Sequence, residues 1–138
     1  MNRLPPGVLD TCVVIALDAV DPDELPDDQA ITAITLGELT VGPLATDDPD
    51  ERARRQLRLQ AVEHDFAESM LDYDPAAARV FGAVMAGALR RGRRSRVRVS
   101  DYQIAAIAIV HGLALYTINV EDFAQIDGLD LRRVTAPR

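Results

Sequence analysis

The chain of 138 residues contains no tryptophan, no lysine and a single cysteine, Cys12. One cysteine cannot form an internal disulfide, and its position beside an acid indicates a small core residue rather than a nucleophile. With only two histidines, His64 and His111, the sequence offers no cluster of the kind that holds zinc, and we assign neither histidine a role. Aromatic residues make up 4% of the chain. Valine, isoleucine, leucine and alanine must therefore fill the core.

Long hydrophobic runs are also missing. The longest, residues 104–110, is far shorter than the roughly 20 residues that span a membrane. No segment ahead of Cys12 looks like a signal peptide, so we expect a soluble, cytoplasmic protein that does not associate with membranes. Hydrophobic residues make up 48% of the chain, which is enough for a folded core, and no linker or repeat divides it. Residues 1–138 are expected to form a single domain.

Positive charge comes from arginine alone. The net charge of −7 argues against nucleic-acid binding over the whole surface. However, six of the fifteen basic residues fall within residues 90–98. We expect three of them to bind phosphate, because arginine pairs with phosphate through two parallel hydrogen bonds. These three are Arg93, Arg94 and Arg96. A solvated loop in a protein whose arginine content reflects a GC-rich genome is the alternative.

Short apolar runs alternate with helical patterns along the chain. The apolar runs predict strands at residues 7–10, 30–34, 70–73, 113–118 and 129–134. The intervening patterns predict helices at residues 11–17, 36–42, 50–64, 75–89 and 101–111. Thr35 and Ser100 are the expected N-caps of two of these, and Gly42-Pro43 the expected stop of one. Strands that alternate with helices are typical of parallel sheets covered on both faces. The sequence thus predicts an α/β fold, a three-layer α/β/α domain with a central, mostly parallel sheet of about five strands.

Acidic residues accompany several of these buried segments. Asp10 ends the first strand, Glu38 lies in the second helix, and Asp101 lies in the first turn of a very apolar helix. Each has an ordinary structural explanation: a helix cap for Asp10, a solvated side chain for Glu38 and a favourable interaction with the helix dipole for Asp101. Their joint occurrence favours a shared site, because open α/β sheets place their ligands at the carboxyl ends of the strands.

Converging carboxylates would repel one another unless a divalent cation neutralised them. Carboxylate oxygens suit Mg²⁺, and Mn²⁺ as well, so the sequence predicts a metal-dependent phosphoryl enzyme. Enzymes with an aspartyl nucleophile are the main rivals. Receiver domains require a lysine, which this chain lacks, and dehalogenase-like phosphatases place a second aspartate where Cys12 stands.

Four short motifs occur in order along nearly the whole chain. They are Leu9-Asp10-Thr11, Thr35 with Glu38, Asp101 followed by Ile104-Ala105-Ala106-Ile107-Ala108, and Thr117-Ile118-Asn119 with Asp122-Phe123. In these motifs the chain resembles the PIN-domain ribonucleases, in particular the VapC-type toxins of bacterial type II toxin–antitoxin pairs. Asn119 departs from the many members that carry an acid at this position. Asp122 is the candidate for the fourth carboxylate, with a helix cap as its alternative.

The resemblance implies a PIN-like domain and a Mg²⁺-dependent endoribonuclease that hydrolyses RNA phosphodiester bonds. It also implies a cognate antitoxin that neutralises the enzyme, and a homodimer. The implied catalytic residues are Asp10, Glu38, Asp101, Asn119 and Asp122, of which the four carboxylates bind the metal. Thr11 is a candidate RNA contact, as the three arginines are on the ground of their charge. We expect the helices at residues 35–41 and 50–64 to form the surface that contacts the antitoxin. Two alternatives stay open: an RNA-processing nuclease without a toxin role, and a degenerate PIN domain that binds partners without catalysis.

Overall fold

The computed structural model describes residues 3–92 and 98–138. Within these residues the centre is a five-stranded sheet in the order β3-β2-β1-β4-β5, and every neighbouring pair is parallel. The strands are β1 (Gly7–Leu9), β2 (Gln29–Thr32), β3 (Met70–Leu71), β4 (Ala114–Thr117) and β5 (Leu131–Arg133). In this register Val8 lies beside Ala30 of β2 and Leu115 of β4. The five predicted strands are confirmed, and the sheet is entirely rather than mostly parallel.

Helices connect and cover the strands. They are α1 (Thr11–Ile15), η1 (Pro22–Glu24), α2 (Ala33–Leu44), α3 (Pro49–Asp65), α4 (Pro75–Arg90), α5 (Val99–Val110) and η3 (Val120–Phe123). The dipeptide Asp-Pro opens η1, α3 and α4. In each case the aspartate accepts a backbone hydrogen bond as N-cap, and the proline stands where a missing N–H costs nothing. Among the described residues, no helix combines the length and the apolar character that a membrane span requires.

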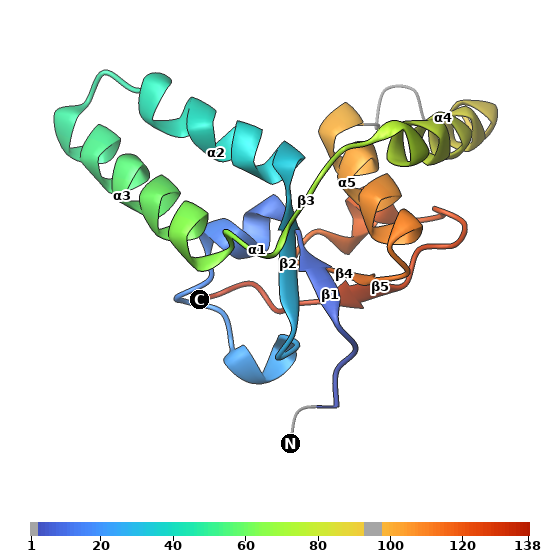
Figure 1. Cartoon of the computed structure of the whole chain (residues 1–138), viewed down its shortest axis with the longest axis horizontal. Coiled ribbons are helices and arrows are strands. Elements are labelled where there is room, and N and C mark those ends of the chain that lie inside the picture. Colours follow the sequence, from blue (N-terminus) through green and yellow to red (C-terminus); the bar gives the residue numbers. More distant parts are fainter. Residues whose placement is uncertain (1–2, 93–97) are drawn as a thin grey trace.

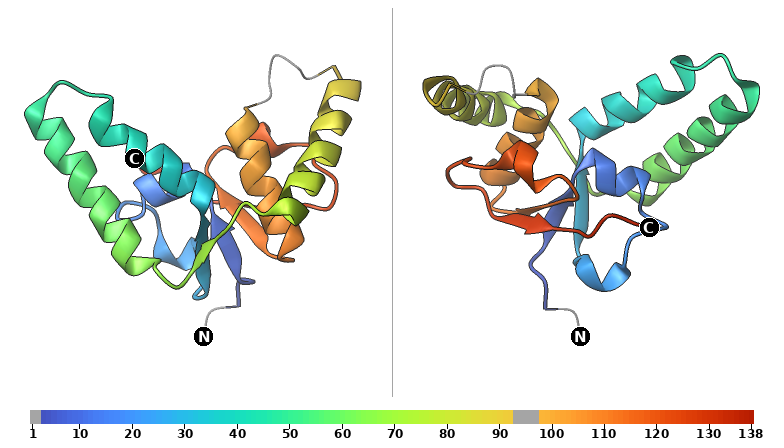
Figure 2. Two further views of the ribbon diagram at one scale, coloured as in Figure 1. Left: turned by 45° about the horizontal axis from the view of Figure 1, so that its top comes forward. Right: turned by 180° about the vertical axis from the view of Figure 1, so that it is seen from behind.

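Two hydrophobic clusters hold the helices against opposite faces of the sheet. Leu9 and Tyr116 belong to the cluster shared with α1 and α3, whereas Val8 and Leu115 belong to the cluster shared with α5 and Phe123. Neighbouring strand residues serve opposite faces because side chains alternate along a strand. Figures 1 and 2 show the α2–α3 hairpin on one side of the sheet and the α4–α5 pair on the other. The predicted α/β/α arrangement is confirmed.

The boundaries predicted for the second strand and second helix are wrong by a few residues. The strand ends at Thr32, whose hydroxyl accepts a hydrogen bond from the N–H of Thr35 (3.2 Å) and caps the helix. The expected cap, Thr35, therefore lies inside α2. The helix also continues past the predicted stop at Gly42-Pro43 to Leu44. A proline so near the C-terminus removes one intrahelical hydrogen bond and ends the helix within a residue.

The predicted cap of the fifth helix is also wrong. α5 begins at Val99 with Arg98 at the N-cap position, so Ser100 lies within the first turn. The side chain of Arg98 makes no capping hydrogen bond, because a guanidinium cannot accept a hydrogen bond from a backbone N–H. The side chain of Arg98 therefore plays no part in capping α5.

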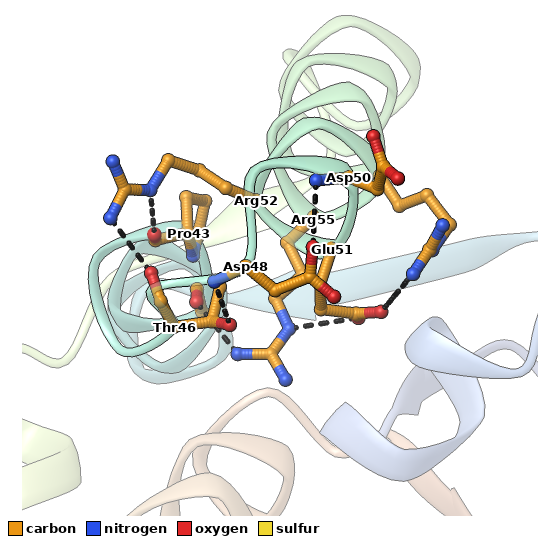
Figure 3. Close-up of polar contacts among 9 residues, drawn as sticks. Pro43, Thr46, Asp48, Asp50, Glu51, Arg52 and Arg55 are labelled. Carbon is orange, nitrogen blue, oxygen red and sulfur yellow. Dashed lines mark hydrogen bonds and ion pairs between the residues drawn. The ribbon is translucent and has the colours of Figure 1, made fainter.

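Arginines of α3 fix the turn between α2 and α3 (Figure 3). Arg52 donates through Nε to the carbonyl oxygen of Pro43 (3.2 Å) and through Nη2 to that of Thr46 (2.7 Å). Arg55 donates through Nη1 to the carbonyl oxygen of Gly42 (2.9 Å). Pro43 lies in the last turn of α2, where carbonyl groups lack a partner within the helix, so the bond from Arg52 satisfies its carbonyl group. The other two bonds tie α3 to the end of α2 and to the turn that follows it. These bonds hold α2 against α3, and they thereby fix the position of α2, the helix that carries Glu38.

Candidate functional site

Asp10 directly follows β1 and is 4% exposed. Its N–H donates to the carbonyl oxygen of Tyr116 in β4 (2.9 Å), which places the residue at the carboxyl edge of the sheet. Its Oδ1 accepts a hydrogen bond from the N–H of Thr11 (2.9 Å), so Asp10 also caps α1. Its Oδ2 accepts from the hydroxyl of Thr117 (2.8 Å) and from the thiol of Cys12 (3.2 Å). The carboxylate of Asp10 therefore caps α1 and, through Thr117, links the end of β1 to β4.

The thiol of Cys12 is part of this hydrogen-bond network. The side chain is half-buried against the core, and its Sγ also lies 3.5 Å from Oγ1 of Thr117. Burial raises the pKa of the thiol, and the neighbouring charge of Asp10 raises it further. A thiol with a raised pKa is protonated at neutral pH, whereas a nucleophile must be a thiolate. Cys12 thus acts as a hydrogen-bond donor to Asp10.

Glu38 is held by two threonines. Thr11 donates through Oγ1 to Oε1 of Glu38 (2.8 Å), and Oγ1 of Thr35 lies 2.9 Å from the same hydroxyl. Because a hydroxyl carries a single proton, Thr35 must be the donor to Thr11. This chain of bonds ties α1 to α2 and orients the carboxylate. The proton of Thr11 is thus committed to Glu38, and the contact between Thr11 and substrate stays a prediction.

Asp101 lies in the first turn of α5 and is 6% exposed. Its Oδ2 is buried without a hydrogen-bond partner in the described residues, and Nε of Arg98 lies 3.7 Å from it. Burial raises the pKa of this carboxyl to about 6, and the charge of Asp10 adds to the rise. Arg98 opposes the rise, while Asp122 and Glu38 contribute smaller increases. A buried carboxylate oxygen without a donor is costly, and a bound cation would remove that cost.

Asn119 and Asp122 lie in the segment after β4. The N–H of Asn119 donates to the hydroxyl oxygen of Thr117 (3.0 Å), the same hydroxyl that donates to Asp10. Asn119 is exposed and occupies the N-cap position of η3 without a side-chain capping bond. Asp122 is half-buried inside η3. The cap position therefore belongs to Asn119, and the helix-cap explanation for Asp122 is wrong.

All five predicted catalytic residues line one cavity of about 330 Å³. They are Asp10, Glu38, Asp101, Asn119 and Asp122, and the cavity is completed by Thr11, Cys12, Ile15 and Arg98. In the part of the chain that the structure describes, no three carboxylate, thiol or imidazole side chains are already arranged as a metal-ligand set. Nevertheless, the four carboxylates and the amide are hard oxygen donors of the type that Mg²⁺ and Mn²⁺ accept. This donor chemistry and the unpartnered oxygen of Asp101 fit a divalent cation.

The arginine cluster is only partly described. Arg93, Arg94 and Arg96, the predicted phosphate-binding residues, lie outside the described residues. Arg98, at the end of the same cluster, lines the cavity, although it is not among the three arginines predicted to bind phosphate. The available signal was its spacing, because a residue three positions before Asp101 lies on the same side of a helical turn.

Two buried threonines were also missed as functional residues. Thr35 and Thr117 belong to the quoted motifs, but their roles depend on contacts with Thr11 and Asp10 that are distant in sequence. Both are fully buried, and each hydroxyl supports a hydrogen-bond chain that ends on a candidate acid. The histidines, by contrast, are both exposed, in line with the absence of an assigned role.

Comparison with known proteins places the chain in a family. No protein-family model matches it. Ribonuclease VapC5 of Mycobacterium tuberculosis is 39% identical over 125 residues, which cover 88% of this chain and 88% of that protein. Ribonuclease VapC4 of the same organism is 31% identical over 128 residues, covering 91% and 94%. The tRNA(fMet)-specific endonuclease VapC of Shigella flexneri is 35% identical over 101 residues, covering 72% and 70%.

Solved structures agree with these sequence matches. The crystal structure of VapBC-5 from Mycobacterium tuberculosis, a member of the VapBC family of toxin–antitoxin systems, matches with a TM-score of 0.80 at 37% identity. That match covers 96% of this chain and 100% of the other. The DNA-bound VapBC of Salmonella typhimurium matches with a TM-score of 0.69 at 26% identity, covering 94% and 98%. The chain therefore belongs to the VapC family of PIN-domain ribonucleases, the toxins of toxin–antitoxin pairs.

Proposed function

We propose that this chain is a Mg²⁺-dependent endoribonuclease that also accepts Mn²⁺ and that acts as a cytoplasmic toxin neutralised by a cognate antitoxin. The observation that carries the metal dependence is the buried Oδ2 of Asp101. This atom has no hydrogen-bond partner in the described chain, and its carboxylate shares a cavity with three others. Four like charges in one cavity destabilise each other, and a divalent cation offsets that repulsion. Membership of a family of ribonucleases supports RNA as the substrate class.

The carboxylates of the cavity would hold the metal, and Asn119 would add a neutral oxygen at its rim. When bound, the cation supplies charge neutralisation at the phosphate and lowers the pKa of a bound water. The chain's own contribution is orientation. Thr117 fixes one oxygen of Asp10, and Thr11 fixes one oxygen of Glu38. Partners of this kind matter because losing one typically costs 10- to 100-fold in metal affinity or activity.

We assign the antitoxin contact to the α2–α3 hairpin. Three large apolar side chains of this hairpin are strongly exposed: Val41 (59%), Leu44 (79%) and Leu57 (65%). Large apolar side chains that are strongly exposed on two paired helices favour a contact with another protein. The solved structures that resemble this chain include complexes of toxin with antitoxin, which supports such a partner. The homodimer implied by the resemblance is a separate proposal, which light scattering tests directly.

Metal binding and RNA cleavage are the decisive measurements. Calorimetric titration with MgCl₂ and MnCl₂ is expected to detect binding to the wild-type protein, and EDTA is expected to stop cleavage of single-stranded RNA. Asp101→Asn should weaken metal binding and abolish cleavage. Asp27→Asn is the matched control, because Asp27 is exposed and precedes β2, at the opposite edge of the sheet. Cleavage that persists in EDTA would show the metal dependence to be wrong.

Growth of the expressing cell separates the alternatives. A toxin should arrest growth unless its antitoxin is expressed with it, and Asp101→Asn should not. Metal-dependent cleavage without growth arrest would indicate an RNA-processing nuclease instead. A wild-type protein that neither binds metal nor cleaves RNA would indicate a degenerate domain that acts through protein contacts.

A further inference from the structure

We propose that Arg98 binds the scissile phosphate of the RNA, and that its guanidinium moves to that phosphate from its resting position beside Asp101. This inference rests on the proposed nuclease function and adds the residue that brings a polyanion into an acidic cavity. The main observation behind the proposal is that Arg98 lines the same cavity as four carboxylates.

Charge alone makes such a residue necessary. The protein is acidic overall, with a net charge of −7, and the cavity concentrates acids further. A phosphate approaching this surface is repelled unless a local cation attracts it. Among the described residues that line the cavity, Arg98 is the one basic side chain. A divalent cation would reduce the negative charge of the cavity, and a guanidinium would add N–H donors for the phosphate oxygens that the cation leaves unbound.

The geometry leaves the guanidinium available. Nε of Arg98 lies 3.7 Å from Oδ2 of Asp101, which is too far for a hydrogen bond. Within the described chain the side chain of Arg98 makes no hydrogen bond, so its five N–H donors are uncommitted there. The side chain of Arg98 is 63% exposed, whereas that of Asp101 is 9% exposed. A long ion pair with one exposed partner is weak, so little is lost when the guanidinium moves away.

A phosphate offers this group the short hydrogen bonds that it does not make with Asp101. Arginine and phosphate match geometrically, because two N–H groups of the planar guanidinium can bond two phosphate oxygens at once. Arg98 thus lies beside a buried acid in the structure and contacts the phosphate when RNA binds.

Substitutions at Arg98 test the proposal, because RNA binding and metal binding should respond to them differently. Arg98→Gln should raise the KM for single-stranded RNA about tenfold or more, as expected for the loss of a charge-assisted hydrogen bond. It should also reduce the dependence of log affinity on log salt by about 0.7, the contribution of one phosphate contact in a single strand. Mn²⁺ affinity without RNA should be unchanged or tighter, because a positive charge has left a cation site.

Two further variants serve as comparisons. Arg98→Lys keeps the charge without the planar fork and should fall between wild type and Arg98→Gln. Arg79→Gln changes the net charge equally, at an exposed position of α4 that does not line the cavity, and should leave KM and the salt dependence unchanged. Thermal unfolding checks that each variant is folded.

The outcomes distinguish this inference from the proposed function. A wild-type KM and salt dependence in Arg98→Gln would overturn the inference while leaving the nuclease function intact. Weaker Mn²⁺ binding in Arg98→Gln would also overturn it, because Arg98 would then merely hold Asp101 in place. If the wild-type protein does not cleave RNA, the proposed function fails. The RNA affinities of the wild-type protein and of Arg98→Gln, measured by fluorescence anisotropy, then still decide whether Arg98 binds phosphate.

Discussion

The hydroxyl of Thr117 donates a 2.8 Å hydrogen bond to Oδ2 of Asp10 across 107 positions of sequence. Thr117 ends β4 and Asp10 follows β1, and these two strands are neighbours in the sheet. The same hydroxyl oxygen accepts the N–H of Asn119. One fully buried threonine therefore orients the first candidate acid and anchors the segment that carries two further site residues.

Substitution of Thr117 tests the role of its hydroxyl group while the volume of the side chain is kept. Thr117→Val keeps the volume but removes the donor to Asp10 and the acceptor for Asn119. We expect a loss of about 2 kcal/mol in the free energy of unfolding, since an unmade hydrogen bond to a buried charged group costs on that order. RNA cleavage should also fall in Thr117→Val, whereas Thr117→Ser should keep the stability and the cleavage activity of the wild type. Urea unfolding and RNA cleavage measure the two effects, and equal behaviour of the valine and serine variants would contradict this role.

The raised pKa of Asp101 predicts how stability depends on pH in the metal-free protein. The folded-state pKa is about 6, compared with an ordinary value of 3.8. Between these values the folded protein keeps a proton that the unfolded chain has lost, so stability falls as the pH rises through this window. At about 1.36 kcal/mol per pKa unit, the full cost above pH 6 is about 3 kcal/mol.

Asp101→Asn removes this ionisation and should therefore stabilise the metal-free protein by about 3 kcal/mol at pH 8, with little effect at pH 4. Urea unfolding in EDTA at both pH values measures the difference. A gain of the same size at both values would show that the ionisation of Asp101 is not its cause.

Thr11 offers a second test of carboxylate orientation. Thr11→Val removes the hydrogen bond to Glu38 and leaves the buried hydroxyl of Thr35 without its acceptor. We expect Mn²⁺ affinity or kcat to fall 10- to 100-fold, as is typical when a residue that orients a metal ligand is lost. Thr11→Ser is the control. A rise in KM with kcat and metal affinity unchanged would instead indicate that Thr11 contacts the RNA directly.

The proposed antitoxin surface is tested with charged substitutions on the α2–α3 hairpin. Leu44→Glu and Leu57→Glu should prevent formation of the complex with the cognate antitoxin, because a buried, unpaired carboxylate is costly in an apolar interface. Cleavage and stability should change little, since both side chains are exposed. Leu89→Glu, at an exposed apolar position of α4, is the matched control. Copurification and calorimetry measure binding, and normal binding by both hairpin variants would rule out this surface.

Much of the fold could be predicted from local patterns. Continuous apolar runs such as residues 113–118 indicate strands buried on both faces, and Asp74-Pro75 indicates where a helix begins. Local sequence patterns gave the wrong helix start where two residues close in the sequence could both occupy the N-cap position. Ile34, a β-branched residue, suggested a strand that the structure ends at Thr32, because the hydroxyl of Thr32 captures the N–H of Thr35 and starts the helix earlier. Ser100 has the chemistry of a cap, but α5 begins one residue before it.

The local sequence predicted which acids line the cavity, because Asp10, Glu38 and Asp101 each adjoin an apolar segment whose burial fixes where its end must lie. It did not determine what these acids contact. The bond from Thr117 to Asp10 exists because β4 lies beside β1, and the order of strands is not encoded in any local period. The position of Arg98 beside the buried oxygen of Asp101 likewise depends on the first turn of α5 facing the cavity. Hydrogen bonds and charge interactions act over a few ångströms, so only the packed tertiary structure decides which of the candidate groups meet.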